Sequence, residues 1–247
     1  SSFLDYIKAN ECQNKLKSLR YVLSGGEILT PGLVSSFYEL IDAKLINIYG
    51  PTETTVCVSY YNCQKEVEYN RVPIGKPIDN TKLLILSEDL TLQPIGVIGE
   101  LAVAGVGVSR GYINNELLTN EKFIKNPFNK KETIYLTGDF ARLLPDGNLD
   151  YIGRRDNQVK IRGFRIELDE VETTIKKHPF VKDVIVKTVE YNNDKSLCAY
   201  IIANKNEIIE AEDIKIFSGG FLPEYMIPSY FVFLEEFPLL DNGKVDR

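Results

Sequence analysis

The sequence lacks the features by which membrane-spanning and secreted proteins are recognised. It contains no apolar run approaching the ~20 residues that a helix needs to cross a bilayer, and its N-terminal Ser-Ser-Phe-Leu-Asp-Tyr carries no signal-peptide pattern. It also lacks an initiator methionine, so we expect the chain to begin inside a longer protein. We expect no membrane partner.

Histidine, clustered basic residues and paired cysteines are scarce as well. The one histidine, His178, precedes a helix-ending proline, which leaves no His-based nucleophilic or metal site. The chain has 29 basic and 35 acidic residues, and its net charge of −6 argues against a nucleic-acid partner. No two cysteines have C-x-x-C spacing, and Cys57 and Cys63 are expected to be buried or free thiols in a reducing, cytoplasmic setting.

The composition is that of an ordinary globular protein, with 44% hydrophobic and 26% charged residues in a chain of 247, which suffices for one or two domains. The first part predicts a parallel crossover, with a strand over 19–23, a helix that begins at Thr30-Pro31 and a second strand over 45–49. Because the loops 24–27 and 50–53 follow the two strands, both are expected at the edge of the sheet where functional loops lie. The Ser-Gly-Gly-Glu loop 24–27 matches no phosphate-binding spacing and can equally be a plain turn.

The stretch from Tyr135 to Glu172 is unusually dense in turn residues and charges. Its Pro-Asp-Gly-Asn segment 145–148 predicts a tight turn, so Asp139 and Arg154 should lie near opposite ends of one hairpin. A carboxylate there can accept hydrogen bonds from the diol of a ribose, and an arginine nearby supplies a forked donor. The pair suggests a nucleoside site, although Gly-Asp in a turn is often only structural.

Two further segments have different patterns of residues. Short strands with frequent glycine and proline between 72 and 114 predict a small barrel or distorted sheet. Beyond it, alternating polar and apolar residues at 158–162 predict a strand, and Asp169 with Glu172 indicates a helix start. We therefore expect an α/β and α+β fold that consists of an α/β segment 1–71, a barrel-like segment 72–155 and an α+β lobe 156–247.

Four motifs in order carry a family resemblance: Tyr49-Gly50-Pro51-Thr52-Glu53-Thr54-Thr55, the stretch from Tyr135 to Glu172, Leu222 to Pro228 and Asn242 to Arg247. The chain resembles the adenylate-forming superfamily and, more narrowly, the amino-acid adenylation domain of a nonribosomal peptide synthetase. The resemblance runs from Leu19 to the last residue and covers only the C-terminal half of such a domain. It implies a partial α/β core with a small β-barrel, followed by a mobile α+β lobe.

The resemblance implies an activity and its cofactors. An amino acid would be activated with ATP and Mg²⁺ to an aminoacyl-AMP, and then passed to the phosphopantetheine thiol of a peptidyl carrier domain. Tyr49 would stack on the adenine, Thr52 would bond a phosphate and Glu53 would hold Mg²⁺. The implied nucleotide-binding residues are Gly25, Gly26, Glu27, Asn47, Tyr49, Gly50, Thr52, Asp139, Tyr151 and Arg154. Taken singly, each can also be an ordinary core, capping or surface residue.

Two further roles follow from the resemblance. Lys244 is implied as a catalytic residue that contacts the substrate carboxylate and the α-phosphate, assisted by Thr52. Asp156 is implied as a hinge, and the turn at Gly163 would approach the pantetheine arm. Without the resemblance, Lys244 can also be a solvated residue near the chain end, and Asp156 can also be an ordinary turn-forming residue. Arg110-Gly111-Tyr112 is expected to have a packing role.

The implied side-chain pocket consists of apolar or small residues, which predicts an apolar amino acid such as leucine, isoleucine or phenylalanine. These residues are Leu23, Gly25, Ile48, Val56 and Cys57. The phosphate loop of the family and the aspartate that would pair with the substrate amino group belong to the missing N-terminal half, so we expect the chain alone to be inactive. An acyl- or aryl-CoA ligase and a non-catalytic module that docks a carrier domain remain alternatives.

Overall fold

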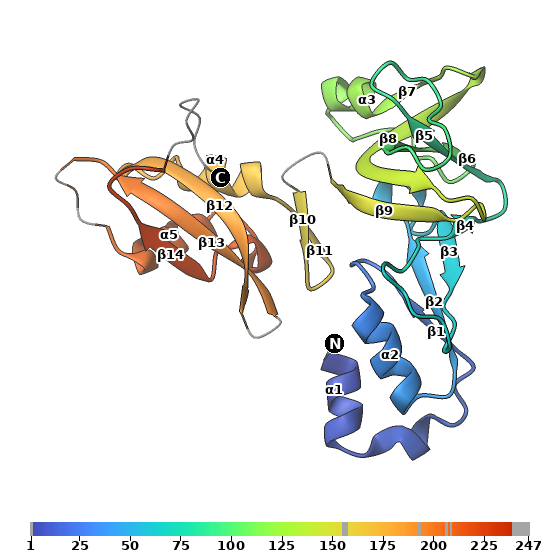
Figure 1. The fold of residues 1–247 in the computed structure, drawn as a ribbon. Helices are drawn as coiled ribbons and strands as arrows, with labels where there is room; N and C mark the ends of the chain where they lie inside the picture. The colour runs from blue at the N-terminus through green and yellow to red at the C-terminus, as the bar shows by residue number, and fades with distance from the viewer. Residues whose placement is uncertain (1, 155–157, 192–193, 206, 208, 239–247) are drawn as a thin grey trace. The chain divides into compact units, whose positions relative to one another are not determined.

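The computed structural model describes residues 2–154, 158–191, 194–205, 207 and 209–238. The chain divides into two compact units, Ser1–Asp156 and Asn157–Arg247, and each is described by itself (Figure 1). The mixed α/β character predicted from the sequence is confirmed, with several small sheets and few helices. Within the described ranges, no helix is both long and apolar enough to cross a membrane.

The first unit begins with the predicted crossover. Its first elements are α1 (Ser2–Ala9), a 3-10 turn (Cys12–Leu16), β1 (Tyr21–Ser24), α2 (Pro31–Leu40) and β2 (Lys44–Tyr49). Strands β1 and β2 pair in parallel, with Tyr21 opposite Lys44. The side chain of Thr30 accepts a hydrogen bond from the Leu33 amide and Pro31 is the first helical residue, so the predicted helix start is confirmed.

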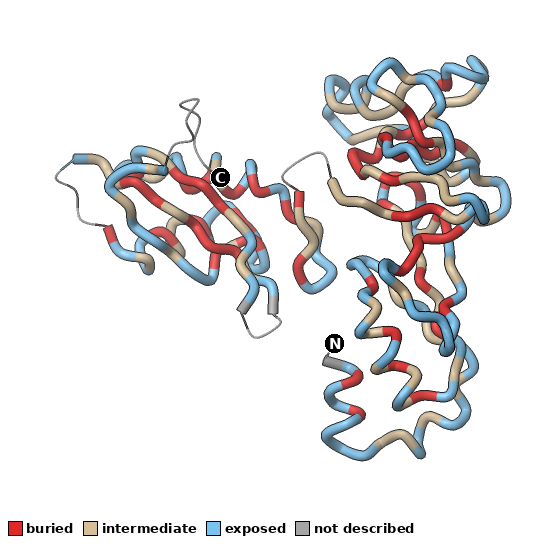
Figure 2. Tube along the Cα trace, viewed as in Figure 1, coloured by how far each residue is buried: buried red, intermediate tan, exposed pale blue. Residues whose placement is uncertain are grey.

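A small core holds α2 against this sheet. Val34, Phe37 and Ile41 are buried at helical spacing, whereas Leu33 and Leu40 of the same helix are only half-buried. The sheet continues with two antiparallel strands, β3 (Ser59–Asn62) and β4 (Lys76–Pro77). Figure 2 shows the buried residues running along β2 and α2.

The segment with the barrel-like texture forms one five-stranded sheet. Its elements are β5 (Thr81–Leu86), β6 (Gly99–Gly105), α3 (Glu116–Lys122), β7 (Phe123–Asn126), β8 (Asn129–Leu143) and β9 (Leu149–Arg154). The strand order is β5-β6-β8-β7, and β9 also pairs with the long strand β8. The predicted tight turn is confirmed between β8 and β9, where the Leu144 amide donates to the Asn148 carbonyl over 2.8 Å and Gly147 has φ of +82°.

Backbone hydrogen bonds connect this hairpin to the first sheet. The Ile74 amide donates to the Leu149 carbonyl over 2.8 Å, and the Leu149 amide donates to the Gly75 carbonyl over 2.9 Å. Ile74 and Leu149 share one buried cluster with Tyr49 and Tyr151. The end of β2 and the β8–β9 hairpin are therefore packed on a common core.

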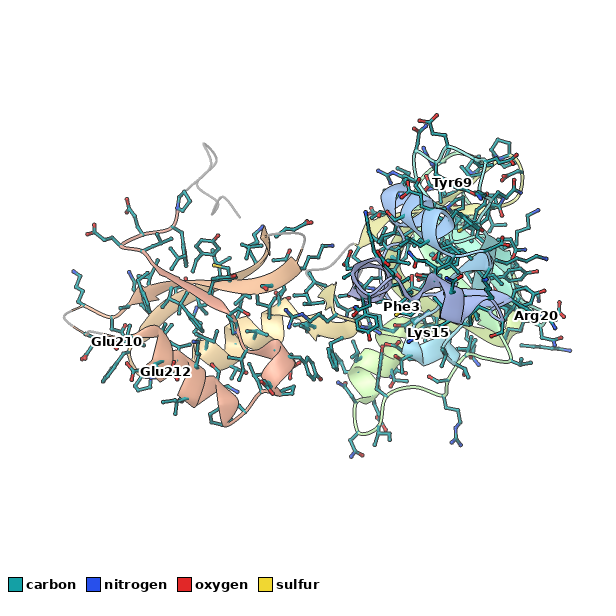
Figure 3. The ribbon with its side chains drawn as sticks, turned by 90° about the horizontal axis from the view of Figure 1, so that it is seen from below. Phe3, Lys15, Arg20, Tyr69, Glu210 and Glu212 are labelled. Atoms are coloured by element: carbon teal, nitrogen blue, oxygen red, sulfur yellow. The ribbon has the colours of Figure 1, made fainter. Side chains whose placement is uncertain are left out.

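The second unit is a small α+β lobe with its own core. It contains β10 (Gln158–Ile161), β11 (Phe164–Glu167), α4 (Leu168–Ile175), β12 (Val181–Tyr191), β13 (Asp194–Ala203), α5 (Ala211–Gly219) and β14 (Tyr230–Phe233). The predicted apolar stripe of Leu168, Val171 and Ile175 is buried. Helix α5, which begins after Glu210 (Figure 3), and strand β14 were not predicted from the sequence.

Asp169 and Glu172, which were predicted to mark a helix start, do not form a capping pair at the start of α4. Helix α4 begins at Leu168, so Asp169 lies inside its first turn and does not cap it. The carboxylate of Glu172 accepts a hydrogen bond from the Val186 amide over 2.9 Å. This contact ties α4 to β12 in addition to the apolar packing between them.

Candidate active site

The centre of the candidate site is the carboxylate of Asp139, which is 4% exposed. The sequence predicted that Asp139 and Arg154 lie near opposite ends of one hairpin. The antiparallel pairing of β8 with β9 places them at the two chain ends of this hairpin and directly opposite each other, because the open end of a hairpin brings its two outermost residues together. Arg154 Nη1 donates to Asp139 Oδ1 over 2.8 Å, which makes a largely buried ion pair.

Two tyrosines complete the surroundings of this carboxylate. Tyr151 Oη donates to Asp139 Oδ1 over 3.4 Å, and Tyr49 Oη donates to Asp139 Oδ2. Burial, together with the negative charge of Asp139, raises the pKa of Tyr49 well above its ordinary value, so its hydroxyl remains a donor. The rings of Tyr49 and Tyr151 lie 6.2 Å apart between centroids, at an angle of 43°.

The backbone before Asp139 is held by a short hydrogen-bond network. The Gly138 amide donates to Glu100 Oε1 over 3.0 Å. Thr137 Oγ1 donates to the Leu101 carbonyl over 2.7 Å and accepts from the Asp139 amide over 3.0 Å. The β8 ladder is irregular here, with register shifts toward both neighbours and a φ of +73° at Gly138. Such bulges re-aim a side chain, and this one directs Asp139 toward Tyr49.

The loop after β2 turns back sharply. Thr52–Thr54 forms a single 3-10 turn, and Thr55 and Val56 have φ of 62° and 71°. A side chain at Gly50 would place its Cβ 2.4 Å from the Val56 carbonyl oxygen, so only glycine fits at this position. Thr52 is exposed on this turn.

Glu53, in contrast, is 8% exposed. Tyr112 Oη donates to Glu53 Oε1 over 2.7 Å. Burial raises the pKa of Tyr112 far above its ordinary value, so the phenol is the donor in this contact. Tyr112 was expected to have a packing role before a catalytic one, and no local signal could have revealed this partner because the two residues are 59 positions apart.

The donor chemistry at Glu53 fits Mg²⁺ bound together with phosphates. A carboxylate oxygen is a hard ligand, and Mg²⁺ commonly binds through one or two carboxylates with phosphates and waters. Within the described residues, no group of three or more His, Cys, Asp or Glu side chains could hold a metal ion by itself. A metal cage made by protein side chains alone does not fit this part of the chain.

The remaining predicted residues lie around the loops that follow β1 and β2. Gly26 has φ of +90° with open space beside its Cα, and a Cβ on Gly25 would lie 2.5 Å from Ile48 Cγ1. Leu23 and Val56 are 62% and 73% exposed. Glu27 is exposed, and Cys57 donates to the Ser59 carbonyl over 3.4 Å.

One described residue of the prediction, Asn47, directs its amide away from this cluster. Asn47 is buried, and its Nδ2 donates to the Pro73 carbonyl over 2.8 Å, so its amide donor serves the interior of the first unit. Asp156 and Lys244 lie outside the described residues. Their predicted roles as hinge and catalytic lysine therefore remain predictions.

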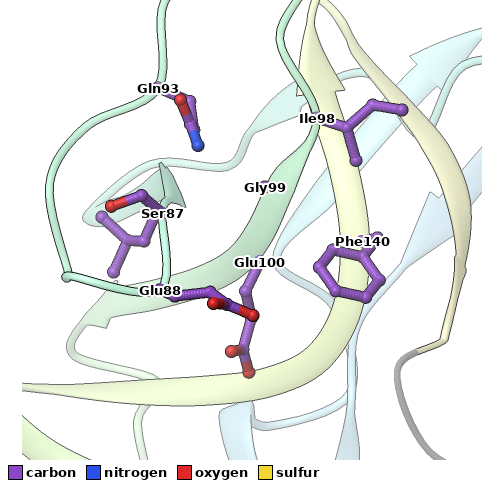
Figure 4. A pocket seen from close by; sticks show the side chains of 8 residues that line it. Ser87, Glu88, Gln93, Ile98, Gly99, Glu100 and Phe140 are labelled. Carbon is purple, nitrogen blue, oxygen red and sulfur yellow. The ribbon is translucent and has the colours of Figure 1, made fainter.

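A hollow of about 90 Å³ lies on the five-stranded sheet, the second sheet of this unit, and none of the predicted site residues that the structure describes lines it. It is lined by Leu86, Ser87, Glu88, Gln93, Ile98, Gly99, Glu100 and Phe140 (Figure 4). Glu100 is its connection to the candidate site, because the same side chain accepts from the Gly138 amide. A second hollow lies at the start of β1 and β2, the end opposite to the two glycine-containing loops.

Two family models match the chain. The AMP-binding enzyme model matches residues 2–113, and the model of the AMP-binding enzyme C-terminal domain matches residues 170–244. Together they cover most of the sequence. The order of the two matches agrees with the order of the motifs.

Curated relatives and a solved structure agree with these matches. Tyrocidine synthase 3 of Brevibacillus parabrevis is 49% identical over 247 residues, which are 100% of this chain and 4% of that protein. Bacitracin synthase 1 of Bacillus licheniformis is 49% identical over 235 residues, 94% of this chain and 4% of that protein. Holo-PA1221, a nonribosomal peptide synthetase protein with adenylation and carrier domains bound to a vinylsulfonamide inhibitor, superposes with a TM-score of 0.82 and 31% identity, over 95% of this chain and 40% of that one.

The buried ion pair leads to a prediction about stability. We expect Arg154→Met to lower the free energy of unfolding by about 3 kcal/mol, because it leaves the Asp139 carboxylate buried without its cation. Lys82→Met serves as the control, since it removes an exposed ion pair of similar length, 2.9 Å to Glu132, and should cost less than about 1 kcal/mol. Urea unfolding followed by circular dichroism measures both. If both variants lowered the free energy of unfolding by the same amount, the buried Asp139–Arg154 pair would stabilise the protein no more than the exposed pair, contrary to this prediction.

Proposed function

Because the chain belongs to the family of AMP-binding enzymes, and within it to the adenylation domains of nonribosomal peptide synthetases, we propose that it is part of an amino-acid adenylating ligase. A carboxylate oxygen of the amino acid attacks the α-phosphorus of ATP, the bond to the bridging oxygen breaks, and pyrophosphate leaves. The phosphopantetheine thiol of a peptidyl carrier domain then attacks the aminoacyl-AMP, which forms a thioester and releases AMP.

The observation that carries this proposal is the buried Asp139 carboxylate between Arg154 and the two tyrosines. The neighbouring guanidinium favours the ionised carboxylate, and a carboxylate has about four lone-pair positions. In our proposal the two ribose hydroxyls of ATP donate to Asp139 in place of the hydroxyls of Tyr49 and Tyr151, and the aromatic face of Tyr49 lies against the adenine.

The loop after β2 is assigned to the phosphates. The exposed hydroxyl of Thr52 donates to a phosphate oxygen, and the carboxylate of Glu53 holds Mg²⁺. The metal ion, when bound, neutralises charge on the phosphates. Gly25, Gly26 and Glu27 form the neighbouring loop, and the open backbone at Gly26 allows a close approach of the nucleotide.

The substrate side chain is proposed to be apolar. Leu23 and Val56 are exposed beside the two loops that hold the nucleotide, and a surface of this kind favours an apolar ligand over a charged one. We propose that a preceding half of the domain covers this surface and supplies the remaining contacts to the substrate. The chain spans less than a tenth of the two synthases compared above, which supports such an arrangement.

The second unit is proposed to be the mobile lobe of the enzyme. Asp156, the residue that precedes this unit in the sequence, would act as the hinge. The turn at Gly163, between β10 and β11 with φ of +80°, would approach the pantetheine arm of the carrier. Free thiols at Cys12, Cys57, Cys63 and Cys198 support the reducing, cytoplasmic setting, which remains a prediction.

The experiment that tests this function is ATP–pyrophosphate exchange, measured with a panel of amino acids and simple carboxylates. We expect exchange with an apolar amino acid for a protein that contains the preceding half, and none for residues 1–247 alone. Exchange only with carboxylates that lack an amino group would move the protein to the acyl or aryl ligases. No exchange at all by the longer, folded protein would contradict an adenylating activity and favour the carrier-docking alternative.

Lys244 provides a second test in the same longer protein. We expect Lys244→Ala to lower the exchange rate at least about 100-fold, because a cation that stabilises the developing charge on the α-phosphate is lost. Binding of ATP, measured by calorimetry, should be unchanged. Lys177→Ala removes an exposed lysine after α4 and serves as the control. Full exchange activity in Lys244→Ala would overturn the catalytic role of this residue.

A further inference from the structure

Tyr112 and Glu53 come from separate parts of the first unit. Glu53 lies in the 3-10 turn after β2, and Tyr112 lies in the segment that links β6 to α3. The hydroxyl of Tyr112 donates to Glu53 Oε1 over 2.7 Å. This contact therefore joins the proposed metal ligand to the segment that follows strand β6 of the second sheet.

The backbone of the same segment also holds the turn. The Ser109 amide donates to the Glu53 carbonyl, and Thr55 Oγ1 donates to the Gly107 carbonyl, each over 2.8 Å. A Cβ on Gly107 would lie 2.9 Å from the Thr54 carbonyl oxygen, so the two backbones approach closely. Both the main chain and the carboxylate of Glu53 are thus fixed by residues 107–112.

The ring of Tyr112 is itself held in place. It packs edge-on against Phe123, with centroids 5.5 Å apart at 75°. Its amide donates to Thr119 Oγ1 over 2.9 Å, and Thr119 also lies close to Gly111, whose φ is +131°. These contacts leave the phenol with a defined position from which to direct its hydroxyl at Glu53.

The chemistry of the donor is suited to a carboxylate that must bind a cation. A lysine or arginine at this place would compensate the charge of Glu53 and weaken its attraction for a metal ion. A phenol fixes one carboxylate oxygen by a hydrogen bond and brings no positive charge. The contact therefore orders the carboxylate without adding a positive charge of its own.

From these contacts we propose that Tyr112 is a positioning residue, which orients the Glu53 carboxylate for Mg²⁺ bound to the phosphates of ATP. This inference rests on the proposed function. Groups that orient a metal ligand commonly change metal affinity by about 10-fold to 100-fold when they are removed. Tyr112 therefore contributes to metal affinity without contacting the metal.

The test is Tyr112→Phe in the longer protein, which keeps the packing against Phe123 and removes only the hydroxyl. We expect binding of Mn²⁺ in the presence of ATP, measured by electron paramagnetic resonance, to weaken about tenfold. The Mg²⁺ concentration for half-maximal exchange should rise by a similar factor, and ATP binding without metal should stay the same. Tyr69→Phe is the matched control, because it removes a hydroxyl that accepts from the Gln64 amide elsewhere in the unit (Figure 3).

Glu53→Gln separates the role of Tyr112 from that of the carboxylate it contacts. If Glu53→Gln weakens Mn²⁺ binding, Tyr112→Phe added to it should have no further effect, since both act through one carboxylate. Unchanged metal binding in Tyr112→Phe, together with a defect in Glu53→Gln, would overturn the positioning role alone. Unchanged metal binding in Glu53→Gln would overturn the proposed metal role of Glu53 and the inference with it.

Discussion

The buried, charged carboxylate of Asp139 joins the two sheets of the first unit. Removing such a group from water costs several kcal/mol unless cations and donors surround it. Arg154 supplies the cation from the paired strand, and Tyr49 supplies a hydroxyl from the other sheet, 90 positions away. The hydrogen bonds to this carboxylate therefore join the hairpin to the end of β2, in addition to the backbone contacts of Leu149.

Both sheets of the first unit contribute contacts to the proposed site. The hairpin β8–β9 is attached to the first sheet by the backbone contacts of Leu149, and the segment 107–112 attaches the second sheet to the turn that carries Glu53. The ribose side and the metal side of the proposed site thus use separate contacts between the same two sheets. A displacement of one sheet would disturb both sides at once.

Local sequence signals predicted the parts of this arrangement that local chemistry determines. The crossover β1–α2–β2 followed from Thr30-Pro31 and the apolar strands, the hairpin followed from 145–148, and the family matches confirm the resemblance. The pairing of Tyr112 with Glu53 and the use of Glu100 by Gly138 could not be predicted, because they join residues far apart in sequence. For Asn47 the resemblance implied a nucleotide-binding role, but it did not indicate that the amide of this side chain donates to the Pro73 carbonyl in the interior of the first unit.

We propose that the Asp139 carboxylate, held by Arg154, binds the ribose hydroxyls of ATP. The most direct measurement compares the affinities of ATP and 2′,3′-dideoxy-ATP by calorimetry in the longer protein, with and without Asp139→Asn. We predict that the unmodified protein binds ATP at least about tenfold more tightly than the dideoxy analogue, and that Asp139→Asn largely removes this preference. An equal preference in both proteins would contradict the role of Asp139 as the ribose ligand.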